Sequence, residues 1–145
     1  MKKIFTFLIL AIFSAVQLQA QDNASMKKAG TSNIALIHFK EGDIYNFGTI
    51  KMGITAVHEF EFTNTGTLPL LISDCMASCG CTTPEWPKEP ILPGKIGKIK
   101  VTFHTQGHPG EFTKNIFITS NALTDAPTYV LHITGNVTED KEVKK

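Results

Sequence analysis

Residues 54–63 read Ile-Thr-Ala-Val-His-Glu-Phe-Glu-Phe-Thr, and this stretch predicts the fold most clearly. Every second position from Ala56 to Phe62 carries Ala, His or Phe, whereas most of the positions between them carry Thr or Glu. Successive side chains of a β-strand point to opposite faces of its sheet, so this spacing places the aromatic rings together on one face. The stretch therefore predicts a half-buried antiparallel strand.

The same alternation returns at intervals along the chain, and turn residues such as Asn64-Thr65-Gly66 and Pro93-Gly94 separate its occurrences. We expect further extended segments within residues 34–39, 44–47, 69–72, 99–104, 112–119 and 129–134. About seven or eight short strands, with no helical stripe between them, are typical of a β-sandwich. The sequence thus predicts an all-β fold, an antiparallel β-sandwich of about seven to eight strands.

The inward positions of these segments supply the expected core, which consists of large apolar side chains. They are Phe47, Phe60, Phe62, Ile72, Ile99, Val101, Phe103, Ile116, Ile118, Leu131 and Ile133. Burying each contributes about 2 kcal/mol, which suffices for a domain of this size to fold independently.

Length and charge limit the classes of function. The chain has 145 residues, which suits one domain. Its 14 basic residues are all Lys and stand against 13 acidic ones, for a net charge of +1. Such a balance lacks the basic patch that drives nucleic-acid binding, so we expect no nucleic-acid partner.

The first twenty residues have the parts of a secretory signal peptide. Met1-Lys2-Lys3 is a basic start, Ile4 to Val16 is almost wholly apolar, and Ala20 is a small residue at a suitable cleavage position. The apolar run is short for a membrane span, which needs roughly 20 residues. We therefore expect cleavage after Ala20 and an exported protein, periplasmic or secreted, with no stable membrane anchor afterwards.

These features divide the chain into four parts. Residues 1–20 are the expected signal peptide, and residues 21–32 are polar and read as a flexible linker. Residues 33–137 form the expected sandwich domain, and residues 138–145 are a charged tail.

Three cysteines lie within seven residues, at Cys75, Cys79 and Cys81, and they are the candidate metal or redox residues. A turn at Gly80 would bring Cys79 and Cys81 within reach of a disulfide. Two thiolates on one side of the chain would instead suit Cu(I) or Zn(II). The third interpretation is structural, with buried thiols or a stabilising bridge. The spacing alone leaves all three open, so we assign no cofactor.

Catalytic motifs are absent from the sequence. It contains no phosphate-binding loop, no Gly-x-Ser-x-Gly and no helical pair of metal-binding histidines. Its five histidines fall on separate predicted strands and loops, at His38, His58, His104, His108 and His132. A cysteine hydrolase would need one of them beside Cys79 or Cys81 in space. We therefore expect a protein that is not an enzyme.

Several motifs together resemble the bacterial family known as domain of unknown function 1573. They are Phe47-Gly48-Thr49-Ile50, His58 to Gly66, Ser78-Cys79-Gly80-Cys81-Thr82, Pro93-Gly94-Lys95, Ser120-Asn121 and Gly135-Asn136-Val137. The resemblance covers about residues 34–137 and implies an immunoglobulin-like sandwich, similar to Hydin and major-sperm-protein domains. The family's paired cysteines match Cys79 and Cys81, whereas Cys75 is an addition of this sequence. The family has no established activity.

Together these observations predict an exported, non-catalytic immunoglobulin-like module of the cell envelope that has a binding or structural role. Its partner would be a protein or another envelope component, bound through a sheet edge or a loop end. The alternative is a Cu(I)-binding or redox protein that acts through Cys79-Gly80-Cys81. Fold alone does not decide between these functions.

Overall fold

The computed structural model describes residues 33–124 and 128–139, and within them the regular structure consists of eight β-strands. The strands are β1 (Ile37–Phe39), β2 (Ile44–Lys51), β3 (Thr55–Asn64), β4 (Ile72–Ala77), β5 (Thr82–Glu85), β6 (Ile96–His104), β7 (Gly110–Ser120) and β8 (Tyr129–Thr138). No helix that could span a membrane occurs in these two ranges. The apolar run of residues 4–16 and the expected cleavage position lie outside the described residues.

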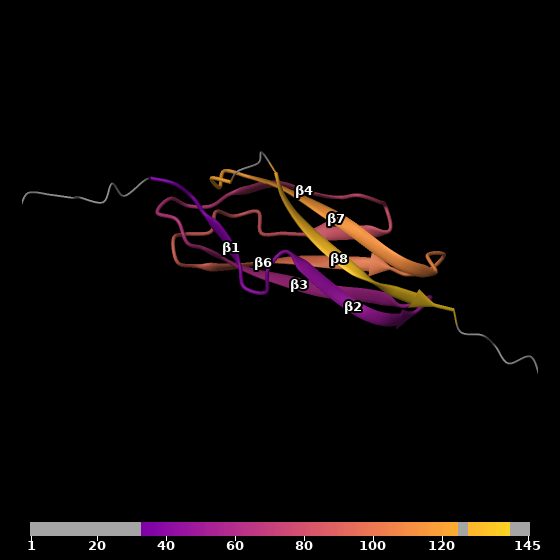
Figure 1. Ribbon diagram of the computed structural model, residues 1–145. Helices are drawn as coiled ribbons and strands as arrows, with labels where there is room; N and C mark the ends of the chain where they lie inside the picture. The colour runs from indigo at the N-terminus through magenta and orange to yellow at the C-terminus, as the bar shows by residue number, and fades with distance from the viewer. Residues whose placement is uncertain (1–32, 125–127, 140–145) are drawn as a thin grey trace, which may run out of the picture. The chain divides into compact units, whose positions relative to one another are not determined.

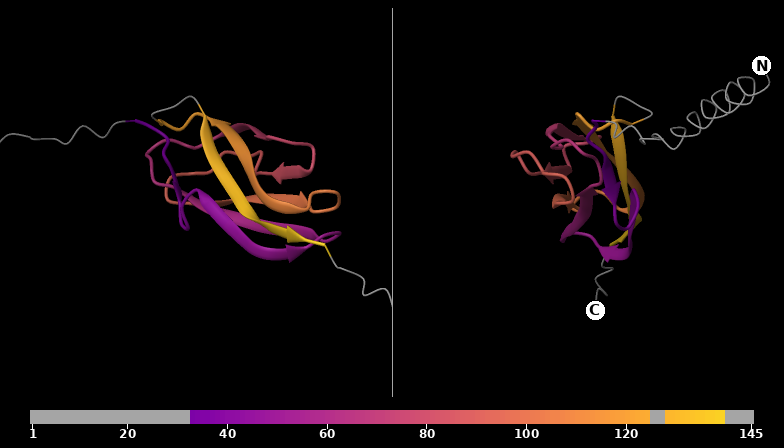
Figure 2. Two further views of the ribbon diagram at one scale, coloured as in Figure 1. Left: turned by 45° about the vertical axis from the view of Figure 1, so that its right-hand side comes forward. Right: turned by 90° about the vertical axis from the view of Figure 1, so that its left-hand side faces the viewer.

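The strands form two four-stranded sheets that pack face to face (Figures 1 and 2). One sheet has the order β1-β3-β6-β5, and the other has the order β2-β8-β7-β4. The predicted β-sandwich is therefore confirmed. The predicted strand of residues 54–63 is β3, which pairs with β6 along nearly its whole length.

One strand pair differs from the antiparallel arrangement that the sequence predicts. β2 runs parallel to β8, with Ile44 opposite His132 and Lys51 opposite Thr138. A short hairpin forces neighbouring strands to be antiparallel, but β2 and β8 lie far apart in the chain, so no turn dictates their relative direction. The register shifts between Asn46 and Thr49, where Gly48 adopts a φ of 65°.

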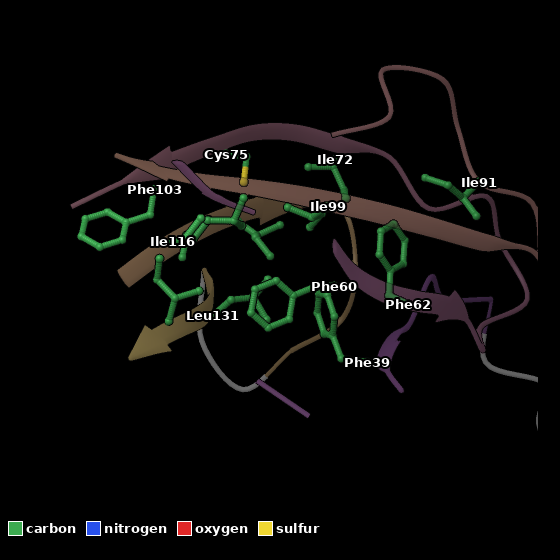
Figure 3. Packing of buried hydrophobic residues seen from close by; sticks show 14 of the residues in the cluster. Phe39, Phe60, Phe62, Ile72, Cys75, Ile91, Ile99, Phe103, Ile116 and Leu131 are labelled. Carbon is green, nitrogen blue, oxygen red and sulfur yellow. The ribbon is translucent and has the colours of Figure 1, made fainter. Parts of the chain in front are cut away.

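The core lies between the sheets and includes all of the expected side chains (Figure 3). Ten of the eleven are buried, and Phe47 is partly buried against the others. The structure adds further buried side chains to the expected core. Four of them lie in loops or on the short β1, where alternation is not visible, and they are Ala35, Phe39, Leu70 and Ile91. The others are Ala56, Cys75, Phe112 and Val137, which lie on β3, β4, β7 and β8.

The turn after β3 is organised by a buried polar residue, Asn64, whose exposure is 0%. Its side-chain amide nitrogen donates hydrogen bonds to the carbonyl oxygens of Leu68 (2.8 Å) and Ile91 (2.9 Å). Its side-chain oxygen accepts hydrogen bonds from the N–H groups of Gly66 (3.0 Å) and Leu36 (3.4 Å). Asn64 therefore ties the end of β3 to two loops and to the segment that precedes β1.

Candidate functional site

The paired cysteines lie in the corner where the chain leaves one sheet and enters the other. β4 ends at Ala77 on the edge of its sheet, and β5 begins at Thr82 on the edge of the opposite sheet. Cys79 and Cys81 lie in the short connection between them and form a disulfide, with their Cα atoms 5.3 Å apart. The structure thus contains the bridged form among the alternatives that the sequence left open.

Backbone hydrogen bonds hold both ends of this corner. The N–H of Ser78 donates to the carbonyl oxygen of Asn115 (2.8 Å), and the N–H of Asn115 donates to the Ser78 hydroxyl (3.1 Å). On the other side, the N–H of His104 donates to the carbonyl oxygen of Cys81 (2.9 Å). Neither anchor depends on the bond between the sulfurs.

A buried hydroxyl faces both sulfurs from the start of β5. Thr82 is only 4% exposed, and its Oγ1 lies 3.6 Å from Cys79 Sγ and 3.8 Å from Cys81 Sγ. The backbone N–H of Thr82 also donates to the carbonyl oxygen of Cys79 (3.2 Å). A hydroxyl in this position can donate to whichever sulfur carries negative charge.

The bridge itself contributes little to the stability of the fold. A disulfide stabilises mainly by restricting the unfolded chain, and a loop of only Cys79, Gly80 and Cys81 accounts for about 1.6 kcal/mol on the chain-entropy model. In the bridged state neither sulfur is a thiolate, so neither acts as a nucleophile or as a ligand for Cu(I) or Zn(II).

Cys75 lies in the core and not in the corner. It is on β4 opposite Ile118 and is 4% exposed, and its sulfur points into the layer between the sheets (Figure 3). Burial, aided by the neighbouring carboxylate of Asp74, raises the pKa of the Cys75 thiol to about 12. Cys75 is therefore a protonated, apolar packing residue in this fold.

The histidines do not gather around the cysteines into a metal centre. Within the described ranges, no three His, Cys, Asp or Glu side chains lie close enough together to hold a metal ion. Four histidines are distributed over four strands and the fifth lies in the turn after β6.

His58 occupies an aromatic cage between the two sheets, which the sequence did not single out as a site. Its ring stacks on that of Tyr45, with centroids 3.5 Å apart, and the rings of Phe47 and Phe60 meet it edge-on. Its Nε2 is buried without a hydrogen-bond partner among the described residues, 3.7 Å from a carboxylate oxygen of Glu41. Burial lowers the pKa of His58, although the nearby carboxylates partly oppose this shift.

The outer face of the β1-β3-β6-β5 sheet is charged and internally paired. Glutamates on β3 and β5 lie beside lysines on β6, and a lysine just after β1 reaches β3. The ion pairs are Lys98–Glu59 (2.9 Å), Lys100–Glu85 (3.2 Å) and Lys40–Glu61 (3.6 Å). Most of the charge on this face is therefore neutralised within the protein.

The outer face of the β2-β8-β7-β4 sheet carries exposed apolar side chains that adjoin one another, whereas the exposed Val57 and Ile96 of the other face lie apart, opposite Thr102 and Thr63. Met76 on β4 lies directly opposite Phe117 on β7, which in turn lies opposite Val130 on β8. Met76 is 58% exposed and Phe117 is 37% exposed. On the same face, Ile44 of β2 lies opposite His132 and is 59% exposed. We call Met76, Phe117, Val130 and Ile44 the apolar face.

The edge strands β4 and β5, in contrast, are protected against pairing with another chain. On β4, the indole of Trp86 donates to the carbonyl oxygen of Ile72 (3.3 Å), and the Asp74 carboxylate accepts from the N–H of Cys75 (2.8 Å). On β5, Pro84 offers no N–H. Edges blunted in this way resist β-strand addition at β4 and β5.

Comparisons with known proteins agree with this architecture. The model of the family described as "Protein of unknown function (DUF1573)" matches residues 37–137. No curated protein matches the chain.

Solved structures show the same fold. A protein of unknown function from Porphyromonas gingivalis W83 superposes with a TM-score of 0.64 at 16% identity, over 73% of this chain and 48% of that one, so the chain spans about half of its length. The ASH/PapD-like domain 7 of human CEP192 superposes with a TM-score of 0.59 at 14% identity, over 82% of this chain and 97% of that one. The VesB protease of Vibrio cholerae superposes with a TM-score of 0.56 at 13% identity, over 72% of this chain but only 32% of the protease. Identities this low establish a shared immunoglobulin-like fold and nothing about proteolysis.

Proposed function

The chain belongs to the DUF1573 family, and from its fold and its two unlike faces we propose that it is a non-catalytic, exported module that binds a protein partner in the cell envelope. The apolar face of the β2-β8-β7-β4 sheet is the proposed contact surface.

The observation that carries this proposal is the contrast between the two outer faces. On the face of β3 and β6 the charged side chains are paired with one another, whereas Met76 and Phe117 are exposed neighbours on β4 and β7. Apolar side chains that adjoin across strands mark interaction surfaces more often than single exposed ones do. Covering each of these two side chains would contribute on the order of 1 kcal/mol to association.

Export is the second part of the proposal, and the sequence supports it. A basic start, an apolar run and a small residue at Ala20 are the parts of a cleaved signal, and residues 33–124 and 128–139 include no helix that could span a membrane. A disulfide between Cys79 and Cys81 is also compatible with an oxidising compartment outside the cytoplasm.

The size of the native assembly tests the binding role. We expect the tagged wild-type chain, extracted gently from cells that naturally carry it, to sediment in a complex larger than the monomer. The double variant Met76→Thr/Phe117→Thr should sediment at the monomer's mass. Val57→Thr is the matched control, because Val57 is 47% exposed on the opposite, ion-paired face. A wild-type chain that sediments as a monomer, or a control that behaves like the double variant, would contradict the proposal.

A further inference from the structure

We propose that Cys79 and Cys81 form a thiol–disulfide exchange site whose co-substrate is a dithiol of another protein. Three features of the corner between β4 and β5 support this inference: the bridge is accessible, the fold holds without it, and a hydroxyl is placed to stabilise the departing sulfur. The inference goes beyond the binding role and does not rest on the apolar face.

The bridge can be reached from solvent. Cys79 and Cys81 are half-buried, and Gly80 between them is exposed. A Cβ placed on Gly80 would meet no described atom beyond Cys79 and Cys81 within 4 Å, so the backbone between the two cysteines borders open space. An attacking thiolate therefore has room to approach, which is the first requirement for exchange.

The corner keeps its shape when the bond between the sulfurs opens. Ser78 remains hydrogen-bonded to Asn115, and the carbonyl oxygen of Cys81 remains hydrogen-bonded to β6. The bridge closes a loop with a sequence separation of only two, so its opening releases little chain entropy. Reduction would thus leave two neighbouring thiols on an intact frame, ready to be oxidised again.

The dithiol co-substrate supplies both electrons that reduce the Cys79–Cys81 bond, so the exchange needs no other reductant. A thiolate of the dithiol attacks one sulfur, a mixed disulfide forms, and the Cys79–Cys81 bond breaks to release the other sulfur as a thiolate. The Thr82 hydroxyl, which faces both sulfurs, donates to that thiolate. The second thiol of the co-substrate, as a thiolate, then attacks the co-substrate's own sulfur in the mixed disulfide, and the cysteine that was bound to that sulfur leaves as a thiolate. The co-substrate leaves as a disulfide, and Cys79 and Cys81 have gained two electrons and two protons.

Redox titration of the purified full-length chain with dithiothreitol tests the inference, because alkylation and mass spectrometry report each cysteine. We expect one two-electron transition of Cys79 and Cys81 under native conditions, while Cys75 stays unmodified. We also expect a strand-type circular dichroism spectrum in both states, with a Tm fall on reduction of no more than about 10 °C. A bridge that is reduced only in denaturant, a pair that never oxidises, or a domain that unfolds on reduction would overturn the inference.

The role of Thr82 has its own variant and control. Thr82→Val keeps the shape of the side chain but removes the hydroxyl, so reduction by dithiothreitol should slow about three- to tenfold, because the departing thiolate loses a donor. Thr83→Val is the control, since Thr83 is exposed on the same strand and its side chain points to the opposite face. Equal rates for the wild type and both variants would show that the hydroxyl plays no part in exchange.

Discussion

Replacing Asn64 with Ala should destabilise the domain more than any comparable polar substitution in the described turns. Asn64→Ala removes four side-chain hydrogen bonds, at 2.8, 2.9, 3.0 and 3.4 Å. A typical hydrogen bond contributes about 1 kcal/mol net, and a buried group that loses its partner costs about 1–3 kcal/mol. We therefore expect a loss of about 3–5 kcal/mol, a large part of the 5–15 kcal/mol of a typical domain.

A matched control separates burial from hydrogen bonding. Asn121 also bridges a loop, because its oxygen accepts from the N–H of Leu71 (2.8 Å) and its nitrogen donates to the carbonyl oxygen of Pro69 (3.0 Å). These groups are exposed, so water can replace the side chain, and Asn121→Ala should cost less than about 1 kcal/mol. Urea unfolding followed by the fluorescence of Trp86, the chain's one tryptophan, measures both losses. Losses below 1 kcal/mol for both variants would refute the reasoning.

Three further predictions concern the pH response, a close backbone approach and processing. Burial lowers the pKa of His58 below its ordinary 6.5 in the folded chain, so its contribution to stability is complete above pH 6.5 and is lost as the pH falls toward the folded pKa. The free energy of unfolding in urea should therefore fall more steeply with acid in the wild type than in His58→Gln, by up to ~1.4 kcal/mol per pH unit, and parallel curves would argue against this cause. A Cβ on Gly66 would collide with the carbonyl oxygen of Ile34, so Gly66→Ala should lower the free energy of unfolding by about 2 kcal/mol. Gly80→Ala is the control and should change it very little, because a Cβ there lies in open space. Equal unfolding midpoints for the two variants would contradict the expected collision. N-terminal sequencing of the exported protein should begin at Gln21, and a mature chain that begins at Met1 would disprove cleavage.

The strands could be predicted where apolar and polar residues alternate regularly, so that one face of the strand is apolar and the other is polar. In β3 and β6 the buried positions recur every second residue, and the expected and observed inward side chains agree. Strands that are neighbours in the chain were the expected partners, but among the described strands this holds only for β5 with β6 and for β7 with β8. The parallel pairing of β2 with β8 was beyond such reasoning, because it joins the two ends of the domain and no local turn encodes it.

The cysteine corner was only partly predictable. A bend at Gly80 was predicted from the tolerance of glycine for tight turns, although Gly80 does not adopt a positive φ there, and the spacing could not separate Cys75 from the pair. Cys75 lies on β4, where its partner strand and the opposite sheet bury it, and this depends on long-range packing. The cage around His58 depends in the same way on Tyr45, which comes from the other sheet.

Photocrosslinking in living cells tests the central claim, that the apolar face is the partner surface, most directly. The crosslinking amino acid p-benzoylphenylalanine would replace either Phe117 on the apolar face or Val57 on the ion-paired face, two exposed positions on opposite sheets. We predict a discrete protein adduct from position 117 and none from position 57. Adducts from position 57 alone, or equal adducts from both positions, would contradict the account.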